Sequence, residues 1–242
     1  MRGHLNKLRG SGAASILARA LCYPYEAPSR SYCYDGGGVE PFDPATRIGR
    51  TPVLAYGSNR SPERLWQKFG SQAIIPVENA VLVEHDAVFS AHISSYGAIP
   101  ATIHSAPGTC VSLSVTWLDD AQLELMHESE IKDRNYRVAA LSGSLVTLDC
   151  GGELAEVLVY ISQLGFFVHD DGPVALSAIP AAGRRVPEMT GAQVLDEVHR
   201  RLAGHVAFDA FVMRLVQDVD YRHSCIALLS TDARRVRIQA KD

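Results

Sequence analysis

The stretch TPVLAYGSNRSPERL, residues 51–65, constrains the fold of this chain more than any other. A short apolar run that ends at Tyr56 indicates a buried strand. Ser61 is a good N-cap, and Pro62 then takes the first helical position, where its missing N–H costs nothing. Gly70 is a natural helix stop. The sequence therefore predicts a strand, a polar corner and a helix in immediate succession.

The corner itself, Gly57-Ser58-Asn59, allows two interpretations. Gly-Ser-Asn is common turn chemistry, so an ordinary surface turn is one of them. In the other, consecutive backbone amides converge on an anion or a carbonyl oxygen, and the following helix N-terminus adds a favourable potential. Gly57 would then allow a close approach that a side chain blocks. The three residues alone leave both interpretations open.

Downstream of this helix, the sequence indicates a mixed sheet with few helices. Runs rich in β-branched residues, such as AIIPVENAVLVEH and CVSLSVTWL, are separated by Gly, Pro, Asn and Ser. Asp119 and Gln122 have the spacing of a capping box at the start of the helical segment DAQLELMHESE. Further strand-like runs follow this segment. The order predicts an α+β fold rather than regular βαβ winding.

Composition divides the chain into three parts. Residues 1–50 are expected to form an N-terminal arm, because residues 28–50 are rich in Gly, Pro, Ser and Asp and indicate an irregular connection. Residues 51–165 are expected to form the core. Residues 166–242 carry two apolar stripes at helical spacing, which predict a helical extension packed on that core.

One glutamate stands out as a candidate acid. In LELMHESE, Met126 and Glu130 fall on the apolar face of a helix, whereas Glu128 lies off it. A carboxyl group that points toward the interior is desolvated, which would raise its pKa and suit it to proton transfer near neutral pH. The alternative is an exposed or salt-bridged glutamate, with Arg137 among its possible partners.

Composition also excludes several classes of protein. The net charge of −4 gives no basic footprint for nucleic acid, and no apolar stretch approaches the roughly 20 residues that span a bilayer. The five cysteines and nine histidines are scattered, without a CxxC or HExxH pair, so we expect no metal site. GxGxxG, GxxxxGK[ST] and GxSxG loops are also absent, so nucleotide binding and α/β-hydrolase chemistry lack their usual loops. Unpaired thiols without an export signal predict a cytoplasmic protein.

Taken together, the motifs resemble the γ-glutamylcyclotransferase-like family. They comprise AYGSN, then FSAHISSYGAIPATI, then VSLSVTWLDDAQLELMHESEIKDRNYRV, and together they cover residues 52–162. Glu130 falls at the acid of the family's LDxxE pattern, with Met126 and His127 in the Leu-Asp places. Tyr136 matches the tyrosine that follows. The chain departs from the pattern at His127 and at Ile131, where the family has Asp and Gly.

The resemblance implies a small mixed β-barrel with a few flanking helices and a small-molecule γ-glutamyl substrate. In such a protein Glu130 would be the catalytic residue, shuttling a proton while the α-amine of the substrate attacks its own side-chain carbonyl to give 5-oxoproline and a free amine. No metal or organic cofactor would be needed. The residues implied to bind the substrate are Tyr56, Gly57, Ser58, Asn59 and Tyr136.

Two other functions stay open on the sequence. One fold can serve different uses, so the chain could be a non-catalytic protein that binds a small polar ligand, or an accessory protein that uses its extension for partners. A related amide hydrolase is the other alternative. The sequence names neither the leaving amine nor the oligomeric state.

Overall fold

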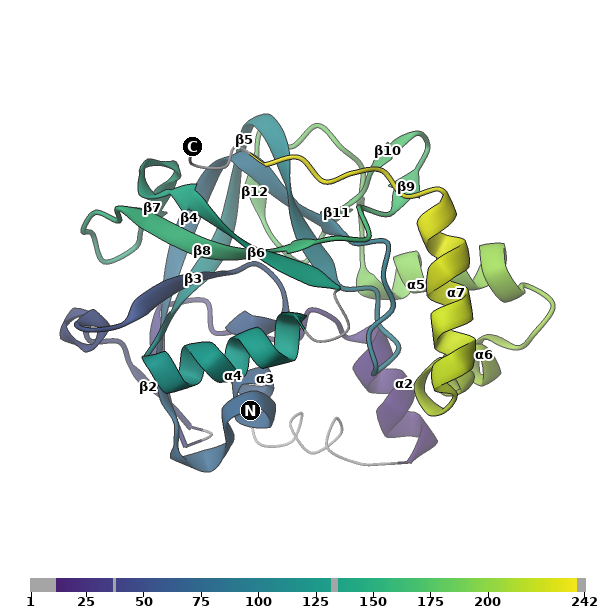
Figure 1. Ribbon diagram of the computed structural model, residues 1–242, viewed down its shortest axis with the longest axis horizontal. Coiled ribbons are helices and arrows are strands. Elements are labelled where there is room, and N and C mark those ends of the chain that lie inside the picture. Colours follow the sequence, from purple (N-terminus) through teal and green to yellow (C-terminus); the bar gives the residue numbers. More distant parts are fainter. Residues whose placement is uncertain (1–11, 37, 132–134, 239–242) are drawn as a thin grey trace.

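The chain combines one large mixed sheet with six α-helices in the computed structural model, which describes residues 12–36, 38–131 and 135–238 (Figure 1). Strands and helices do not alternate regularly, so the α+β class predicted from the sequence is confirmed. Within the described residues, no helix is long and apolar enough to cross a membrane.

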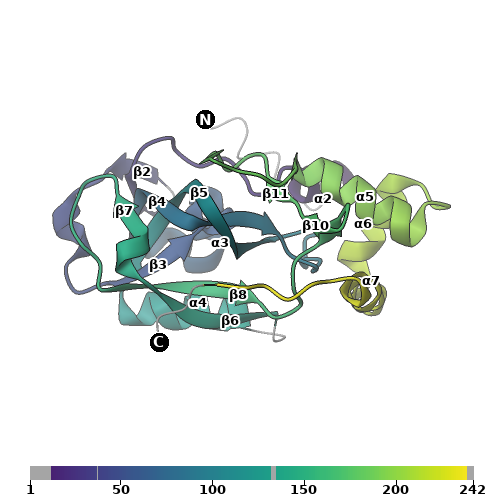
Figure 2. The ribbon, with the colours of Figure 1, turned by 90° about the horizontal axis from the view of Figure 1, so that it is seen from above.

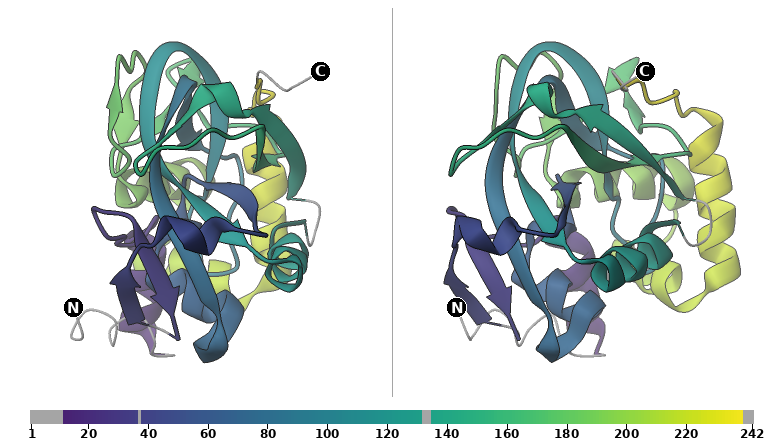
Figure 3. Two further views of the ribbon diagram at one scale, coloured as in Figure 1. Left: turned by 90° about the vertical axis from the view of Figure 1, so that its left-hand side faces the viewer. Right: turned by 60° about the vertical axis from the view of Figure 1, so that its left-hand side comes forward.

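The longest pair of strands is the antiparallel ladder of β4 (Ile74–Phe89) and β5 (Ala101–Leu118). Its register shifts between Val83 and His85, and Glu84 between them has a φ of 61°. An extra residue at such a bulge bends the strand and increases its twist. Figure 3 shows the result, because the pair forms a long, strongly curved ribbon that arches over the molecule.

The remaining strands of the sheet attach to both sides of this ladder. The hydrogen-bonded order is β13-β11-β4-β5-β3-β8-β6, with β1 and β7 also paired to β4, β2 paired to β1, and β12 paired to β5. The bounds of the longer strands are β1 Tyr32–Asp35, β2 Gly38–Pro41, β3 Thr51–Ala55, β6 Tyr136–Ser142, β7 Val146–Leu148 and β8 Glu156–Ser162. The short ones are β11 Ala175–Leu176, β12 Ala181–Ala182 and β13 Glu188–Met189, and β9 Val168–His169 pairs separately with β10 Gly172–Pro173.

The sheet is not a closed barrel within the described residues, which corrects the expectation drawn from the family resemblance. Its path ends at β13 on one side and at β6 on the other. After β6 the chain enters a 3₁₀ turn, η5 (Gly143–Leu145), and then joins β4 as β7. In the part of the chain that the structure describes, no ladder joins β6 to the strands on β4.

Two segments have more strand than the sequence predicts. Residues 28–50 were expected to be irregular, yet they contain β1, β2 and a 3₁₀ turn, η1 (Pro44–Arg47). β1 forms because it pairs with β4 over Ile74–Val77, a tertiary contact that outweighs the local Gly and Pro content. The extension likewise begins with the short strands β9 to β13 and is helical only from residue 191 onward.

The helices end where local signals place them. α3 (Pro62–Phe69) has Ser61 as its N-cap and Gly70 after its last turn, as predicted. α4 (Asp120–Ile131) follows a capping box, in which the Gln122 amide donates to Asp119 at 2.9 Å and the Asp119 amide donates to the Gln122 side chain at 3.2 Å. The other helices are α2 Ala13–Leu21, α5 Gly191–Ala203, α6 Phe208–Gln217 and α7 Val219–Thr231.

Helices α2, α5, α6 and α7 gather at one end of the molecule (Figures 1 and 2). Their apolar faces belong to the same buried cluster as the sheet, which includes Leu54 of β3, Ile103 of β5, Val194 of α5 and Phe211 of α6. Side chains from the terminal regions therefore complete the core that the central strands begin.

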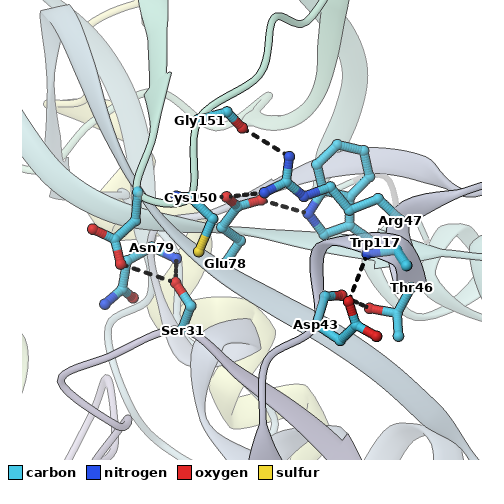
Figure 4. Close-up of polar contacts among 11 residues, drawn as sticks. Ser31, Asp43, Thr46, Arg47, Glu78, Asn79, Trp117, Cys150 and Gly151 are labelled. Carbon is cyan, nitrogen blue, oxygen red and sulfur yellow. Dashed lines mark hydrogen bonds and ion pairs between the residues drawn. The ribbon is translucent and has the colours of Figure 1, made fainter.

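A buried ion pair ties the N-terminal region to the sheet (Figure 4). The Glu78 side chain on β4 is fully buried and pairs with Arg47 of η1 at 2.6 Å. Trp117 Nε1 and the Cys150 amide also donate to this carboxylate, at 3.3 and 3.1 Å, and Arg47 donates to the Gly151 carbonyl at 2.8 Å. Burial raises the pKa of Glu78, although these donors oppose the rise. One carboxylate thus joins four separate segments.

We expect Phe211→Ala to lower the free energy of unfolding by about 3–5 kcal/mol, because it empties a fully buried site at the junction of helices and sheet. Both tryptophans, Trp66 and Trp117, lie in the central region, so their fluorescence reports its unfolding. In urea titrations of Phe211→Ala, the midpoint of unfolding should fall by the same amount whether it is followed by tryptophan fluorescence or by far-UV circular dichroism. Leu228→Ala, on an exposed position of α7, is the control. A midpoint that shifts by dichroism alone would contradict a shared core.

We expect Arg47→Met to destabilise the fold by about 3–5 kcal/mol near neutral pH, because it leaves a buried carboxylate without its cation. Burial already raises the pKa of Glu78 in the folded state. The loss of stability should therefore shrink as the pH falls toward the pKa that Glu78 has in the unfolded chain, because the carboxyl then takes up a proton. Urea titrations at several pH values measure this. The double variant Arg47→Met/Glu78→Gln should recover most of the loss, and an equal loss in both variants would contradict the account.

Candidate active site

The polar corner joins β3 to α3 in the manner the sequence predicts. Gly57 is the N-cap of a 3₁₀ turn, η2 (Ser58–Arg60), and α3 follows directly. The backbone N–H groups at the start of such a turn have no intrahelical acceptor. A Cβ on Gly57 would collide with the hydroxyl of Tyr23.

A cavity of about 740 Å³ lies over this corner. Its wall includes every residue that the sequence analysis singled out for the site, namely Tyr56, Gly57, Ser58, Asn59, Glu130 and Tyr136. It also includes residues from outside the central region, among them Tyr23 beyond α2 and Arg222 of α7. The structure therefore brings the corner and the candidate acid together, and both terminal regions contribute to the wall.

Glu130 reaches the cavity because α4 continues to Ile131. Met126, one turn earlier on the same face, is fully buried, and the Glu130 side chain is 17% exposed. Glu128 is exposed, as its position off the apolar face predicts. The Asn59 amide donates to Glu130 Oε1 at 3.1 Å, so the corner and the acid are in direct contact.

Lys68 of α3 forms an ion pair with Glu130 through the same oxygen, Oε1. Burial by itself raises the pKa of Glu130, but the Lys68 charge and the hydrogen bonds from Lys68 and Asn59 outweigh it and hold the pKa below its usual value. This corrects the expectation of a raised pKa, which considered desolvation alone. Lys68 is itself almost buried, and burial lowers its pKa against the opposing effect of Glu130.

The sequence analysis did not identify Lys68 as part of the site. Its one signal is a spacing of four residues from Arg64, which places both cations on one side of α3. Arg64 lines the cavity itself, donates to Gln67 at 3.1 Å and lies over the Tyr96 ring at 5.6 Å. Arg64 therefore adds a positive side chain to the cavity wall at α3.

The hydroxyl groups of three cavity tyrosines are engaged with the protein itself. Tyr56 donates to the Tyr160 carbonyl, and Tyr136 donates to the Ala101 carbonyl at 2.9 Å. The Tyr160 hydroxyl shares a hydrogen bond with His127 Nδ1 at 2.8 Å. Tyr56 and Tyr136 thus brace the strands below the cavity, and His127, which departs from the family pattern, orients Tyr160.

Some polar groups in the site have capacity to bind a ligand. Asn59 Oδ1 is buried and accepts no hydrogen bond from the described residues.

Ile131, the other departure from the family pattern, is partly exposed and is not part of the cavity wall. Among residues 12–36, 38–131 and 135–238, no group of three or more His, Cys, Asp or Glu side chains is placed to hold a metal ion.

Comparison with known proteins gives low similarities. No protein-family model matches the chain, and no curated protein matches it significantly. A solved γ-glutamyl cyclotransferase is similar at 16% identity and a TM-score of 0.40, covering 79% of this chain and 92% of that one. An uncharacterised protein from Homo sapiens has the same identity and TM-score over 80% of this chain and 93% of its own. A protein from Arabidopsis thaliana is 21% identical over 47% of this chain and 62% of its own, with a TM-score of 0.36.

We expect Lys68→Met to raise the pKa of Glu130, because burial then acts without the cation that opposes it. Titration of the side-chain carboxyl by ¹³C NMR measures this directly. In the unmodified protein the lowered pKa contributes stability that is present above the unfolded pKa and lost as the pH falls through the folded value. Arg200→Met, an exposed ion-pair residue of α5, is the control. An unchanged pKa in Lys68→Met would show that the pair is not formed in solution.

Proposed function

We propose that this chain is a γ-glutamylcyclotransferase-like enzyme, which cyclises a γ-glutamyl amine or peptide to 5-oxoproline and releases the amine. The observation that supports it most is the contact between Glu130 and Asn59 at 3.1 Å inside one cavity. It places a carboxylate beside a corner of backbone amides, and these are the two groups the reaction needs. The motif order of the sequence supports the same reaction.

The polar groups of the cavity suit the three polar parts of a γ-glutamyl substrate. The carboxylate of Glu130 and the unpartnered Oδ1 of Asn59 would accept hydrogen bonds from the α-amine. The guanidinium of Arg64 would pair with the α-carboxylate. The amides of Gly57 and Ser58, which precede the first helical turn, would then bind the oxygen of the side-chain carbonyl.

The reaction in this pose needs one base and no cofactor. The α-nitrogen attacks the side-chain carbonyl carbon, and the oxygen takes up negative charge. Glu130 accepts a proton from the attacking nitrogen and returns it to the leaving nitrogen as the original amide bond breaks. Because the attack is intramolecular, a fixed pose supplies much of the rate enhancement. Lys68 would keep Glu130 ionised before the attack, at the cost of making it a weaker base.

In this proposal the three parts of the chain have distinct tasks. Residues 51–165 carry the corner and the acid, whereas residues 1–50 and 166–242 close the cavity with Tyr23 and with one face of α7. The two terminal parts would then limit the size and charge of the leaving amine.

The ion pair with Lys68 favours a second candidate, a protein that binds a γ-glutamyl compound without turning it over. A carboxylate whose pKa is held low is well suited to binding an ammonium group and less suited to removing a proton. Turnover separates the two candidates. A protein that binds γ-glutamyl compounds by calorimetry but releases no 5-oxoproline would be a binding protein.

We expect Glu130→Gln to lower turnover by about 10²- to 10⁴-fold, because the amide keeps the shape of the side chain but cannot cycle a proton. The assay measures 5-oxoproline released from a panel of γ-glutamyl amines and peptides. Glu128→Gln, two residues away on the exposed face, is the matched control and should retain full activity. If turnover survives in Glu130→Gln and is lost in Glu128→Gln, the acid has been misassigned.

A further inference from the structure

Tyr23, which the sequence analysis did not single out, reaches the corner from the N-terminal region. It follows α2, lines the cavity and is 6% exposed. Its hydroxyl occupies the space that a side chain on Gly57 would need. The hydroxyl is therefore held against the backbone of the corner, where the carbonyl oxygen of a γ-glutamyl substrate would bind.

The hydrogen bonding of this hydroxyl differs from that of its neighbours. The Ala101 amide donates to Tyr23 Oη at 2.9 Å, so the oxygen acts as an acceptor. The phenol hydroxyl can also donate its own proton, and among the described residues no acceptor for that proton is found. Tyr56 and Tyr136, in contrast, donate their protons to backbone carbonyls. Tyr23 is thus fixed by one hydrogen bond and retains its proton for another.

The protonation state of Tyr23 is also suited to donation. Burial raises its pKa well above the usual value, and the surrounding tyrosines and Glu130 add to this effect against the Ala101 hydrogen bond. The group is therefore a neutral phenol near neutral pH, and it does not compete with Glu130 as a base.

We propose that Tyr23 is a further catalytic residue, which donates a hydrogen bond to the oxyanion that forms on the side-chain carbonyl as the α-amine attacks. This inference rests on the proposed function. Tyr23 transfers no proton, and it acts beside the amides of Gly57 and Ser58 on the same oxygen. Gly57 is then required because any side chain there would push the hydroxyl away from the corner.

The test compares Tyr23→Phe with Tyr34→Phe. Loss of one oxyanion donor should lower kcat and kcat/KM together by about 10²- to 10³-fold and leave KM within a few-fold. The Tyr34 hydroxyl donates to the Gly70 carbonyl at 2.6 Å outside the cavity wall, so Tyr34→Phe also loses a hydrogen bond to the backbone. It should keep its kcat. Thermal unfolding of both variants shows whether their losses of stability match.

A second pair of variants tests whether Gly57 and Tyr23 act on one oxygen. Gly57→Ala should lower kcat by displacing the hydroxyl, and Gly57→Ala/Tyr23→Phe should lose no more than Gly57→Ala alone. An unchanged kcat in Tyr23→Phe, or an equal loss in Tyr34→Phe, would overturn the role of Tyr23 and leave the proposed function standing. Absence of 5-oxoproline release from the unmodified protein would overturn both.

Discussion

The antiparallel ladder of β4 and β5 is the constraint on which the rest of the structure depends. It spans residues 74–89 and 101–118, and the bulge at Glu84 lets it curve instead of lying flat. β3 and β12 pair with β5, and β1, β7 and β11 pair with β4, so strands from both terminal regions extend the curved ladder. Ala101, the first residue of β5, then lies under the cavity, held by Tyr23 at its amide and by Tyr136 at its carbonyl.

The chemistry of the cavity depends on a balance at Glu130. Burial favours the neutral acid, whereas Lys68 and Asn59 favour the carboxylate, and the second effect prevails. In the proposed reaction, a base that is ionised at rest is ready to accept a proton, but the same interactions make the transfer less favourable. In that proposed reaction, a substrate ammonium that displaced Lys68 from Oε1 would relieve that conflict, since the carboxylate would then hold the group that must lose a proton before the attack.

The terminal regions are part of the site as well as of the core. α2, α5, α6 and α7 cluster at the end of the molecule where the cavity lies, and their apolar faces merge with the interior of the sheet. The cavity wall on this side includes Tyr23 and Arg222. A residue there can affect ligand binding without belonging to any motif of the central region, because it reaches the site through the packing of its helix.

The sequence by itself determined the features that depend on a few neighbouring residues. Ser61, Pro62 and Gly70 set the limits of α3, and the capping box at Asp119 set the phase of α4 that turns Glu130 inward. Only the tertiary structure decided that the sheet stays open and that β1 joins it. It also decided that Lys68, 62 residues before Glu130, lowers its pKa, and that Tyr23, 78 residues before Ala101, reaches the corner. Caps and helical phase are local and can be read from adjacent residues, whereas pKa values and cavity walls depend on groups that meet only when the chain folds.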